Sequence, residues 1–170
     1  MSSANSTACA AIAQWRRAWR RDHPFGFVAL PTANADDSIN LFAWKISIPG
    51  RLGTDWAGGS YAGRLEFANE FPVQPPVFTF TPPLFHPNVY PNGQVCITTL
   101  AADWCADLTL ADVLLSIQAL LENPNPSSPA QLEAVLLFTE DRETYVKRVK
   151  AMALQFANEN AFAEANEGFV

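Results

Sequence analysis

The sequence predicts one α+β domain over residues 1–170, in which a helix precedes a four-stranded antiparallel meander and three helices follow it. Apolar residues recur three and four positions apart near both ends of the chain, whereas the middle contains short segments rich in β-branched and aromatic residues. A helix, then consecutive strands, then helices is typical of the α+β class. At 170 residues the chain is long enough to bury a core, and its content of 49% hydrophobic residues argues against disorder.

The first half of the chain is predicted to form a helix over residues 8–22 and then four strands. The apolar side of this helix comprises Ile12, Trp15, Ala18 and Trp19. Pro24 ends the helix, because proline lacks the backbone N–H that a helix interior needs. The strands are predicted over residues 25–30, 41–48, 61–67 and 77–80. Turn-rich segments such as residues 34–38 join them, which predicts antiparallel pairing of neighbours.

Three helices are predicted after the strands. Thr109, with Asp112 three residues later, has the spacing of a helix start, and Pro124 ends the helix that follows. Pro129 suits the first turn of the next helix, through about residue 138, and the last helix is predicted over residues 141–156. The terminal segments, residues 1–7 and 157–170, are expected to be mobile.

Residues 85–96, between the last strand and the second helix, carry the most specific chemical signal. Pro87 and Pro91 favour an extended, ordered path, and Asn92-Gly93 predicts a tight turn that keeps Asn88 and Tyr90 near Cys96. A thiol can carry an acyl group as a thioester, and a fixed amide can stabilise the oxyanion that forms when a nucleophile attacks. The segment therefore predicts an active-site loop for covalent acyl transfer.

This segment resembles the His-Pro-Asn-to-cysteine signature of the ubiquitin-like-protein conjugating enzymes, and the resemblance extends over residues 12–156. Within that family the sequence is most similar to the SUMO-conjugating enzymes. The blocks that carry this narrower resemblance are residues 18–27, Gly53-Thr54 with Trp56 and Gly58-Gly59, residues 82–90, and Asp141-Arg142 with Tyr145 and residues 147–149. The resemblance implies the conjugating-enzyme fold, in agreement with the predicted order of elements.

The resemblance also implies a reaction. Cys96 accepts a SUMO-like modifier from an activating enzyme as a thioester and passes it to a substrate lysine as an isopeptide bond. Exchange of one thioester for another is nearly balanced in energy, so Cys96 needs no activating histidine, and His86 is expected to pack and hydrogen-bond. The acceptor lysine, with a reference pKa of about 10.4, must lose a proton, which desolvation against Tyr90 favours. Asn88 either stabilises the oxyanion or braces the neighbouring loop.

A second set of candidate residues lies on the first helix. It comprises Arg16, Arg17, Arg20, Arg21 and His23. The resemblance implies that this face binds the modifier non-covalently and helps to engage the activating enzyme, whereas a merely solvated basic face is the alternative. The net charge of −6 makes the clustering notable and argues against nucleic-acid binding as the main role.

The sequence departs from the family pattern around the expected site. Ser128 stands where an acidic residue is usual, and a neutral hydroxyl can only hydrogen-bond; our hypothesis is that phosphorylation of Ser128 supplies the missing charge.

Val77 and Thr79 stand where the family has lysines that read an acidic residue of the substrate, and the loop at residues 100–104 is short and contains no lysine. A relaxed or ligase-dependent choice of substrate is therefore predicted. We have no physical account of Cys105, where an arginine is usual.

Composition narrows the remaining possibilities. Cys9, Cys96 and Cys105 lack metal-site spacing, so we expect free thiols, no bound metal and no cofactor. ATP is expected to be used by the upstream activating enzyme, because the sequence contains no phosphate-binding GxxxxGK[ST] motif. No segment reaches the roughly 18 apolar residues of a membrane span, and we expect a soluble protein of the nucleus and cytoplasm.

The expected partners are a SUMO-like modifier, its activating enzyme, a SUMO ligase and substrate proteins with acceptor lysines, without nucleic acid or membrane. Three other functions compete with this prediction. A ubiquitin-conjugating enzyme would keep the chemistry and change the modifier, but the basic first helix and the block around Trp56 argue against it. A non-catalytic scaffold that only binds modifiers is disfavoured by the presence of Cys96. A thiol hydrolase is disfavoured because neither His23 nor His86 has an evident orienting partner.

Overall fold

The chain folds around a four-stranded antiparallel sheet whose strands follow one another in sequence order. The structure, a computed structural model, describes residues 3–167, and the side chains of residues 5–157. The strands are β1 (Val28–Ala33), β2 (Ile39–Pro49), β3 (Ser60–Glu66) and β4 (Val77–Phe80), in the order β1-β2-β3-β4. The predicted antiparallel meander is therefore confirmed.

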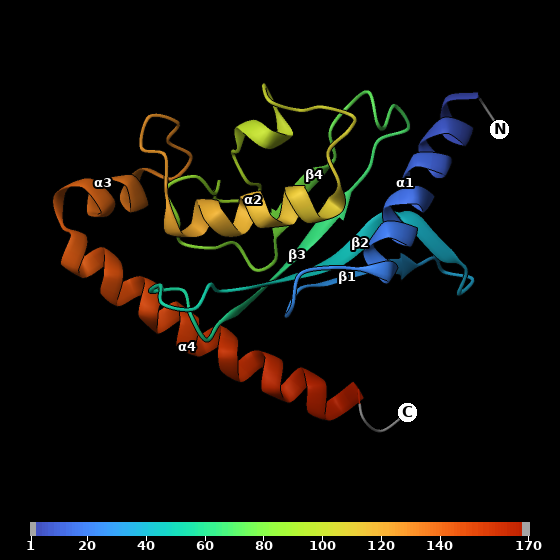
Figure 1. Ribbon diagram of the computed structural model, residues 1–170. Coiled ribbons are helices and arrows are strands. Elements are labelled where there is room, and N and C mark those ends of the chain that lie inside the picture. The colour runs from blue at the N-terminus through green and yellow to red at the C-terminus, as the bar shows by residue number, and fades with distance from the viewer. Residues whose placement is uncertain (1–2, 168–170) are drawn as a thin grey trace.

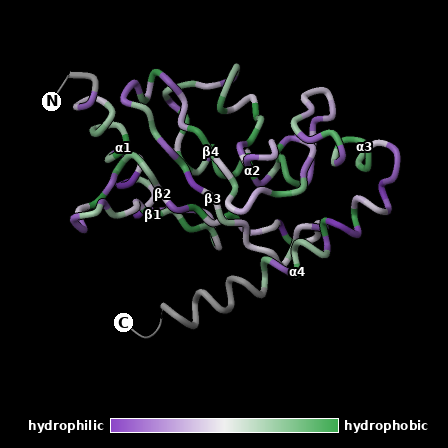
Figure 2. Tube along the Cα trace, turned by 180° about the vertical axis from the view of Figure 1, so that it is seen from behind, coloured by the Kyte–Doolittle hydropathy of each residue, from purple (hydrophilic) through white to green (hydrophobic). Residues whose placement is uncertain are grey.

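One face of this sheet forms part of the core. Along β2, the side chains of Trp44, Ile46 and Ile48 are buried, while Lys45 between them is exposed. Trp44 pairs with Leu65 of β3, which is also buried. Buried residues alternate with less buried ones over residues 44–48 of β2, and Figure 2 shows hydrophobic residues (green) next to hydrophilic ones (purple) in β2 and β3. This period of two, expected for a sheet with one covered face, fixes the register of the strands.

The helices are α1 (Ser3–Arg21), α2 (Leu110–Glu122), α3 (Leu132–Glu140) and α4 (Arg142–Glu167). Figure 1 shows α2 across one face of the sheet, α1 beside one end of the strands, and α3 with the start of α4 at the other end. α1 contacts β2 and α2, and α4 contacts β3 and α3. None of the helices among the described residues is both long and apolar enough to cross a membrane.

The start of α2 is fixed by the predicted pair of Thr109 and Asp112. The Thr109 hydroxyl accepts a hydrogen bond of 3.1 Å from the Asp112 N–H, and the Asp112 carboxylate accepts one of 2.8 Å from the Thr109 N–H. Such a capping box stabilises a helix by about 1 kcal/mol. The buried side of α2 comprises Leu110, Val113, Leu114, Ile117 and Leu121.

Aromatic side chains connect α1 to the loops that precede α2. The Trp15 ring lies edge-on to Phe71 at a centroid distance of 5.0 Å, and its Nε1–H donates to the Leu108 carbonyl at 3.1 Å. Trp104 donates in the same way to the Pro72 carbonyl at 3.0 Å. Each indole thus buries its apolar ring and still satisfies its N–H.

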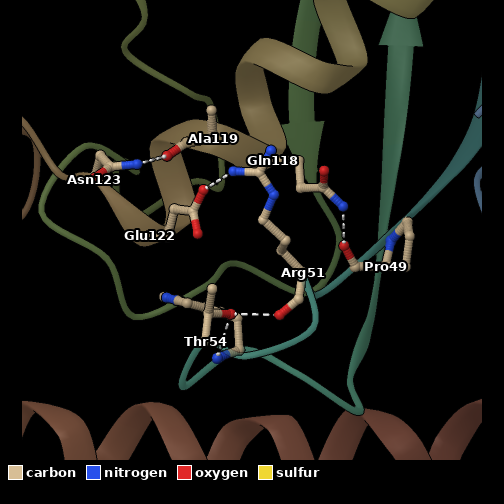
Figure 3. Close-up of polar contacts among 8 residues, drawn as sticks. Pro49, Arg51, Thr54, Gln118, Ala119, Glu122 and Asn123 are labelled. Atoms are coloured by element: carbon tan, nitrogen blue, oxygen red, sulfur yellow. Dashed lines mark hydrogen bonds and ion pairs between the residues drawn. The ribbon is translucent and has the colours of Figure 1, made fainter.

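The connection between β2 and β3 is tied to the second half of α2 (Figure 3). The Gln118 side chain donates to the Pro49 carbonyl at 2.8 Å, and Arg51 forms an ion pair with Glu122. The Thr54 hydroxyl donates to the Arg51 carbonyl at 2.7 Å and closes the turn. Because the Arg51 side chain is largely exposed, this ion pair contributes little to stability, and the bonds mainly set the position of α2.

Several element boundaries differ from the predicted ones. β1 begins three residues later than expected, because residues 24–27 form a turn in which the Phe27 N–H donates to the Pro24 carbonyl. α3 begins at Leu132 rather than at Pro129, because the N–H groups of Ala130 and Gln131 donate to the Pro87 carbonyl instead.

The chain ends also differ from the predicted pattern. α1 begins at Ser3, and α4 continues to Glu167, beyond the predicted end at residue 156. Residues 1–2 and 168–170 lie outside the described residues. The mobility expected for residues 1–7 and 157–170 stays a prediction.

Candidate active site

The candidate site is built on a segment between β4 and α2 that is anchored by His86. The His86 side chain is fully buried, its Nε2 lies 2.9 Å from the Leu120 carbonyl of α2, and its Nδ1 accepts a hydrogen bond from the Asn88 N–H at 3.0 Å. This pattern requires the tautomer with the proton on Nε2. Burial lowers the pKa of His86 to about 4, so the ring is neutral at pH 7. The packing and hydrogen-bonding function expected for His86 agrees with this geometry.

The buried His86 makes stability depend on pH. Its pKa is about 4 in the folded protein and 6.5 in the unfolded chain, so the unfolded state binds the extra proton as the pH falls through this window. We expect the free energy of unfolding to be about 2 kcal/mol lower at pH 5 than at pH 7 on account of this residue. Urea denaturation at both pH values measures it. The His86→Gln variant should lose this part of the slope, and an unchanged slope would contradict the assignment.

Asn88 joins the segment to the loop between α2 and α3. Its side chain is fully buried and donates to the carbonyl oxygens of Asn125 at 2.7 Å and Ser128 at 2.9 Å, while its Oδ1 accepts from the Asn125 N–H at 2.8 Å. Both amide protons are thus engaged by the loop in this structure. Of the two functions predicted for Asn88, this geometry favours bracing the loop over direct donation to an oxyanion.

The predicted Asn92-Gly93 turn brings the two halves of the segment together. The Gly93 N–H donates to the Tyr90 carbonyl at 2.8 Å, and the Tyr90 N–H donates to the Gln94 carbonyl at 2.9 Å. Gly93 has a φ of 91°, and a Cβ atom on it would lie 2.2 Å from the Phe80 carbonyl oxygen. Only glycine fits this position, so the turn is fixed both by conformation and by close packing.

Cys96 emerges from this turn with its thiol accessible. Its backbone N–H donates to the Asn88 carbonyl at 2.8 Å, and its side chain is partly exposed in a groove of about 290 Å³ that Tyr90 also lines. Hydrogen bonding to Cys96 is the largest cause of a raised pKa of the Tyr90 phenol, followed by the charge of the thiolate and by desolvation. The phenol therefore stays protonated at pH 7, and it lines the same groove as Cys96.

Ser128 is brought to the site through its backbone. Its carbonyl accepts the bond from Asn88, and its N–H donates to the Asn125 carbonyl at 3.2 Å. The side chain is partly exposed. The structure thus brings Tyr90 and Cys96 into one groove and connects the backbone of Ser128, 32 positions beyond Cys96 in the chain, to Asn88. The catalytic functions of these four residues stay predictions.

The structure also shows residues that the sequence analysis missed. Asn125 exchanges two hydrogen bonds with Asn88, and its Oδ1 accepts from the Ser127 N–H at 3.0 Å. Gln131 carries a buried Oε1 without a hydrogen-bond partner among the described residues. The run Asn125-Pro126-Ser127-Ser128-Pro129 is a turn signal, but a single sequence does not reveal which distant residue holds such a turn.

The basic residues of the second candidate set lie on a separate surface, at the C-terminal end of α1. Arg17, Arg20 and Arg21 are exposed and Arg16 is half-buried, and no ion pair to any of them occurs within residues 5–157. The His23 ring stacks on Trp19 at a centroid distance of 4.8 Å, and its Nδ1 lies 2.9 Å from the Trp19 carbonyl. Four guanidinium groups are thus available to a partner.

The other cysteines lie away from this arrangement. Cys9 is half-buried in α1, Cys105 is exposed in the loop before α2, and all three cysteines are free thiols. Within the described part of the chain, no group of three or more histidine, cysteine, aspartate or glutamate residues is placed to hold a metal ion.

The chain is similar in sequence to several known proteins. Residues 11–153 match the family model of the ubiquitin-conjugating enzymes. The chain is 47% identical over 154 residues to the SUMO-conjugating enzyme UBC9 of Caenorhabditis elegans, with 89% of this chain and 93% of the relative covered. It is 48% identical over 146 residues to Sumo-conjugating enzyme ubc9 of Dictyostelium discoideum, with coverages of 85% and 92%. It is 42% identical over 155 residues to SUMO-conjugating enzyme SCE1 of Arabidopsis thaliana, with coverages of 90% and 97%.

Proposed function

Because this chain belongs to the ubiquitin-conjugating enzyme family, we propose that Cys96 is the residue on which it carries its modifier. The chain is a SUMO-conjugating enzyme, a transferase that acts through a cysteine thioester. The observation that supports Cys96 is its partly exposed thiol, held at the mouth of a groove by the bond between its N–H and the Asn88 carbonyl. Cys105 is more exposed but lies outside that groove.

The first step is an exchange of thioesters. The Cys96 thiolate attacks the carbonyl carbon of the modifier's C-terminal glycine, which is held on a cysteine of the activating enzyme, and that cysteine leaves as a thiolate. The second step is aminolysis, in which a neutral substrate lysine displaces Cys96 and an isopeptide bond forms. We expect a SUMO ligase to assist this second step by holding the substrate.

Three residues are proposed to support the aminolysis. Tyr90 covers the incoming amine on one side and disfavours its charged form, because its ring lines the same groove as Cys96. Asn88 holds the loop at residues 125–128 and so shapes the other border of the site. Ser128 offers a hydroxyl to the acceptor lysine, and its phosphorylation would add a negatively charged group that positions the lysine and can accept its proton.

Incubation with the two modifier systems tests this function. The protein is mixed with ATP and either the SUMO activating enzyme and SUMO or the ubiquitin activating enzyme and ubiquitin. We expect an adduct with SUMO that a thiol reductant removes, and none with ubiquitin. A ubiquitin adduct alone would identify the alternative conjugating enzyme, and no adduct with either would favour a scaffold that only binds modifiers.

We also propose that Arg16, Arg17, Arg20, Arg21 and His23 bind an acidic surface of the modifier and of the activating enzyme. The guanidinium groups lie together at the end of α1, without an internal carboxylate partner among the described residues. Complementary charge raises the association rate and the affinity, and added salt weakens both effects because it screens the charges.

Charge reversal on this face should weaken non-covalent binding of the modifier. For the double variant Arg17→Glu/Arg21→Glu, we expect a dissociation constant for SUMO at least tenfold higher at low salt, with a smaller difference at high salt. Titration calorimetry measures both conditions. Lys147→Glu/Lys150→Glu on α4 is the matched control, because it changes the net charge by the same amount. An equal loss in both variants would show an effect of overall charge rather than of this face.

A further inference from the structure

The turn at Asn92-Gly93 contains a chemically reactive pair of residues. In such a pair the backbone nitrogen of the glycine can attack the side-chain amide of the asparagine, because glycine has no Cβ atom to hinder the approach. No other asparagine of the chain precedes a glycine. Asn92 is exposed, so water and hydroxide reach it. One position, four residues before Cys96, therefore combines the reactive sequence with access to solvent.

The Asn92 side chain is folded toward the atom that would attack it. Its Oδ1 accepts a hydrogen bond of 3.0 Å from the Gln94 N–H, so the amide group lies back over residue 93. This bond draws electron density from the amide carbonyl and makes its carbon atom a better target for a nucleophile. The Gly93 N–H donates to the Tyr90 carbonyl at 2.8 Å. The reaction therefore starts when this one bond opens, which costs much less than unfolding of the whole chain.

We propose that Asn92 is a site of spontaneous deamidation, and that the isoaspartate form of the protein loses the ability to load Cys96. Hydroxide removes the Gly93 amide proton, and the nitrogen forms a bond to the side-chain carbonyl carbon of Asn92. The side-chain amide nitrogen leaves as ammonia after it takes a proton from water, which gives a cyclic succinimide. Water then opens the ring at either carbonyl. Residue 92 thus becomes aspartate or isoaspartate, and the reaction needs only water and hydroxide.

Isoaspartate disturbs the turn because it lengthens the main chain by one carbon atom where there is no room. The Phe80 N–H donates to the Gly93 carbonyl at 2.8 Å, and a Cβ atom on Gly93 would lie 2.2 Å from the Phe80 carbonyl oxygen. The added atom separates Tyr90 from Gln94, whose backbone groups are joined at 2.9 Å across the turn. Tyr90 and Cys96 line one groove, so their relative position changes. The effect on loading rests on the proposed function, whereas the deamidation does not.

Peptide mapping by mass spectrometry tests the modification. Full-length protein is incubated in warm, mildly alkaline buffer and then digested. We expect residue 92 to deamidate about tenfold faster than Asn34 or more, because Asn34 is also exposed in a turn but precedes alanine. An isoaspartyl methyltransferase should label part of the product. Equal rates at the two positions would overturn the proposal. Fast reaction only in urea-unfolded protein would also overturn it, because the Tyr90 bond would then protect the pair.

Loading of the incubated protein with SUMO tests the consequence. The fraction with isoaspartate should load at least about tenfold more slowly than fresh protein. Asn92→Ser suits the turn and should keep its loading rate through the same incubation. Asn92→Asp carries the new charge without the added atom and should load like fresh wild type. Full loading of the isoaspartate fraction would overturn the proposed inactivation, and slow loading by Asn92→Asp would assign the effect to charge instead. Failure of fresh wild type to load would contradict the proposed function, whereas the mass spectra would still decide the deamidation.

Discussion

Replacement of Cys96 by alanine is expected to abolish the adduct with SUMO completely, because no other thiol lies in the groove beside Tyr90. The unfolding free energy should change little, since the side chain is partly exposed and alanine fills most of its volume. Gel analysis without reductant, after incubation with activating enzyme and ATP, measures the adduct. Cys96→Ser should form an oxygen ester that thiol reductants leave intact, because a hydroxyl can still attack the activated carbonyl.

Two control variants separate Cys96 from the other thiols. Cys9→Ala and Cys105→Ala should load SUMO at the wild-type rate, even though Cys105 is the more exposed thiol. Loss of the adduct in Cys105→Ala, with the adduct kept in Cys96→Ala, would move the reaction to the loop before α2. That outcome would remove the basis of the proposed site.

Replacement of Asn88 by alanine is expected to slow discharge to lysine by about a hundredfold and to lower the unfolding free energy by about 3 kcal/mol. The substitution removes three hydrogen bonds and leaves the polar backbone groups of Asn125 and Ser128 without their partner. Discharge of preloaded enzyme to free lysine measures the first effect, and urea denaturation measures the second. Loading of Cys96 should suffer less, because thioester exchange needs no deprotonated lysine.

A variant in the opposite loop distinguishes the two functions predicted for Asn88. Asn125→Pro removes the one N–H that the Asn88 Oδ1 accepts and leaves the amide group of Asn88 in place. If Asn88 acts by bracing the loop, this variant should also slow discharge at least tenfold. Wild-type discharge by Asn125→Pro, together with slow discharge by Asn88→Ala, would instead support direct donation to the oxyanion.

Local signals in the sequence predicted much of the fold. β4 was placed correctly at residues 77–80 because proline pairs and turn residues bound it closely, and the start of α2 followed from the reciprocal pattern of Thr109 and Asp112. The start of α3 was wrong by three residues. Pro129 is compatible with a first helical turn, but the Pro87 carbonyl, more than 40 positions away, takes the N–H groups of Ala130 and Gln131. The residues near Pro129 in the sequence do not reveal that a distant carbonyl takes these N–H groups.

The sequence indicated which residues form the candidate site, but not which hydrogen bonds join them. The proline-rich segment and its cysteine identified Asn88, Tyr90 and Cys96 as neighbours, because the turn at Gly93 forces them together. The direction in which the Asn88 amide points depends on Asn125, which lies 37 positions away in the chain, beyond α2. Whether an amide braces a loop or faces a substrate is thus a property of tertiary packing.

The absence of lysine from the sequence around Cys96 also limits automodification, the transfer of the modifier from Cys96 to a lysine of the enzyme itself. The chain contains only three lysines, Lys45, Lys147 and Lys150, and none occurs between residues 46 and 146. Lys147 and Lys150 are further engaged by Glu143 and Asp55 on the surface of α4 and the β2–β3 connection. Along the chain each of the three lysines is at least 51 positions from Cys96, so we expect a thioester on Cys96 to modify the enzyme itself only slowly. The lifetime of the charged form is then set by water and by the arrival of a target, rather than by automodification.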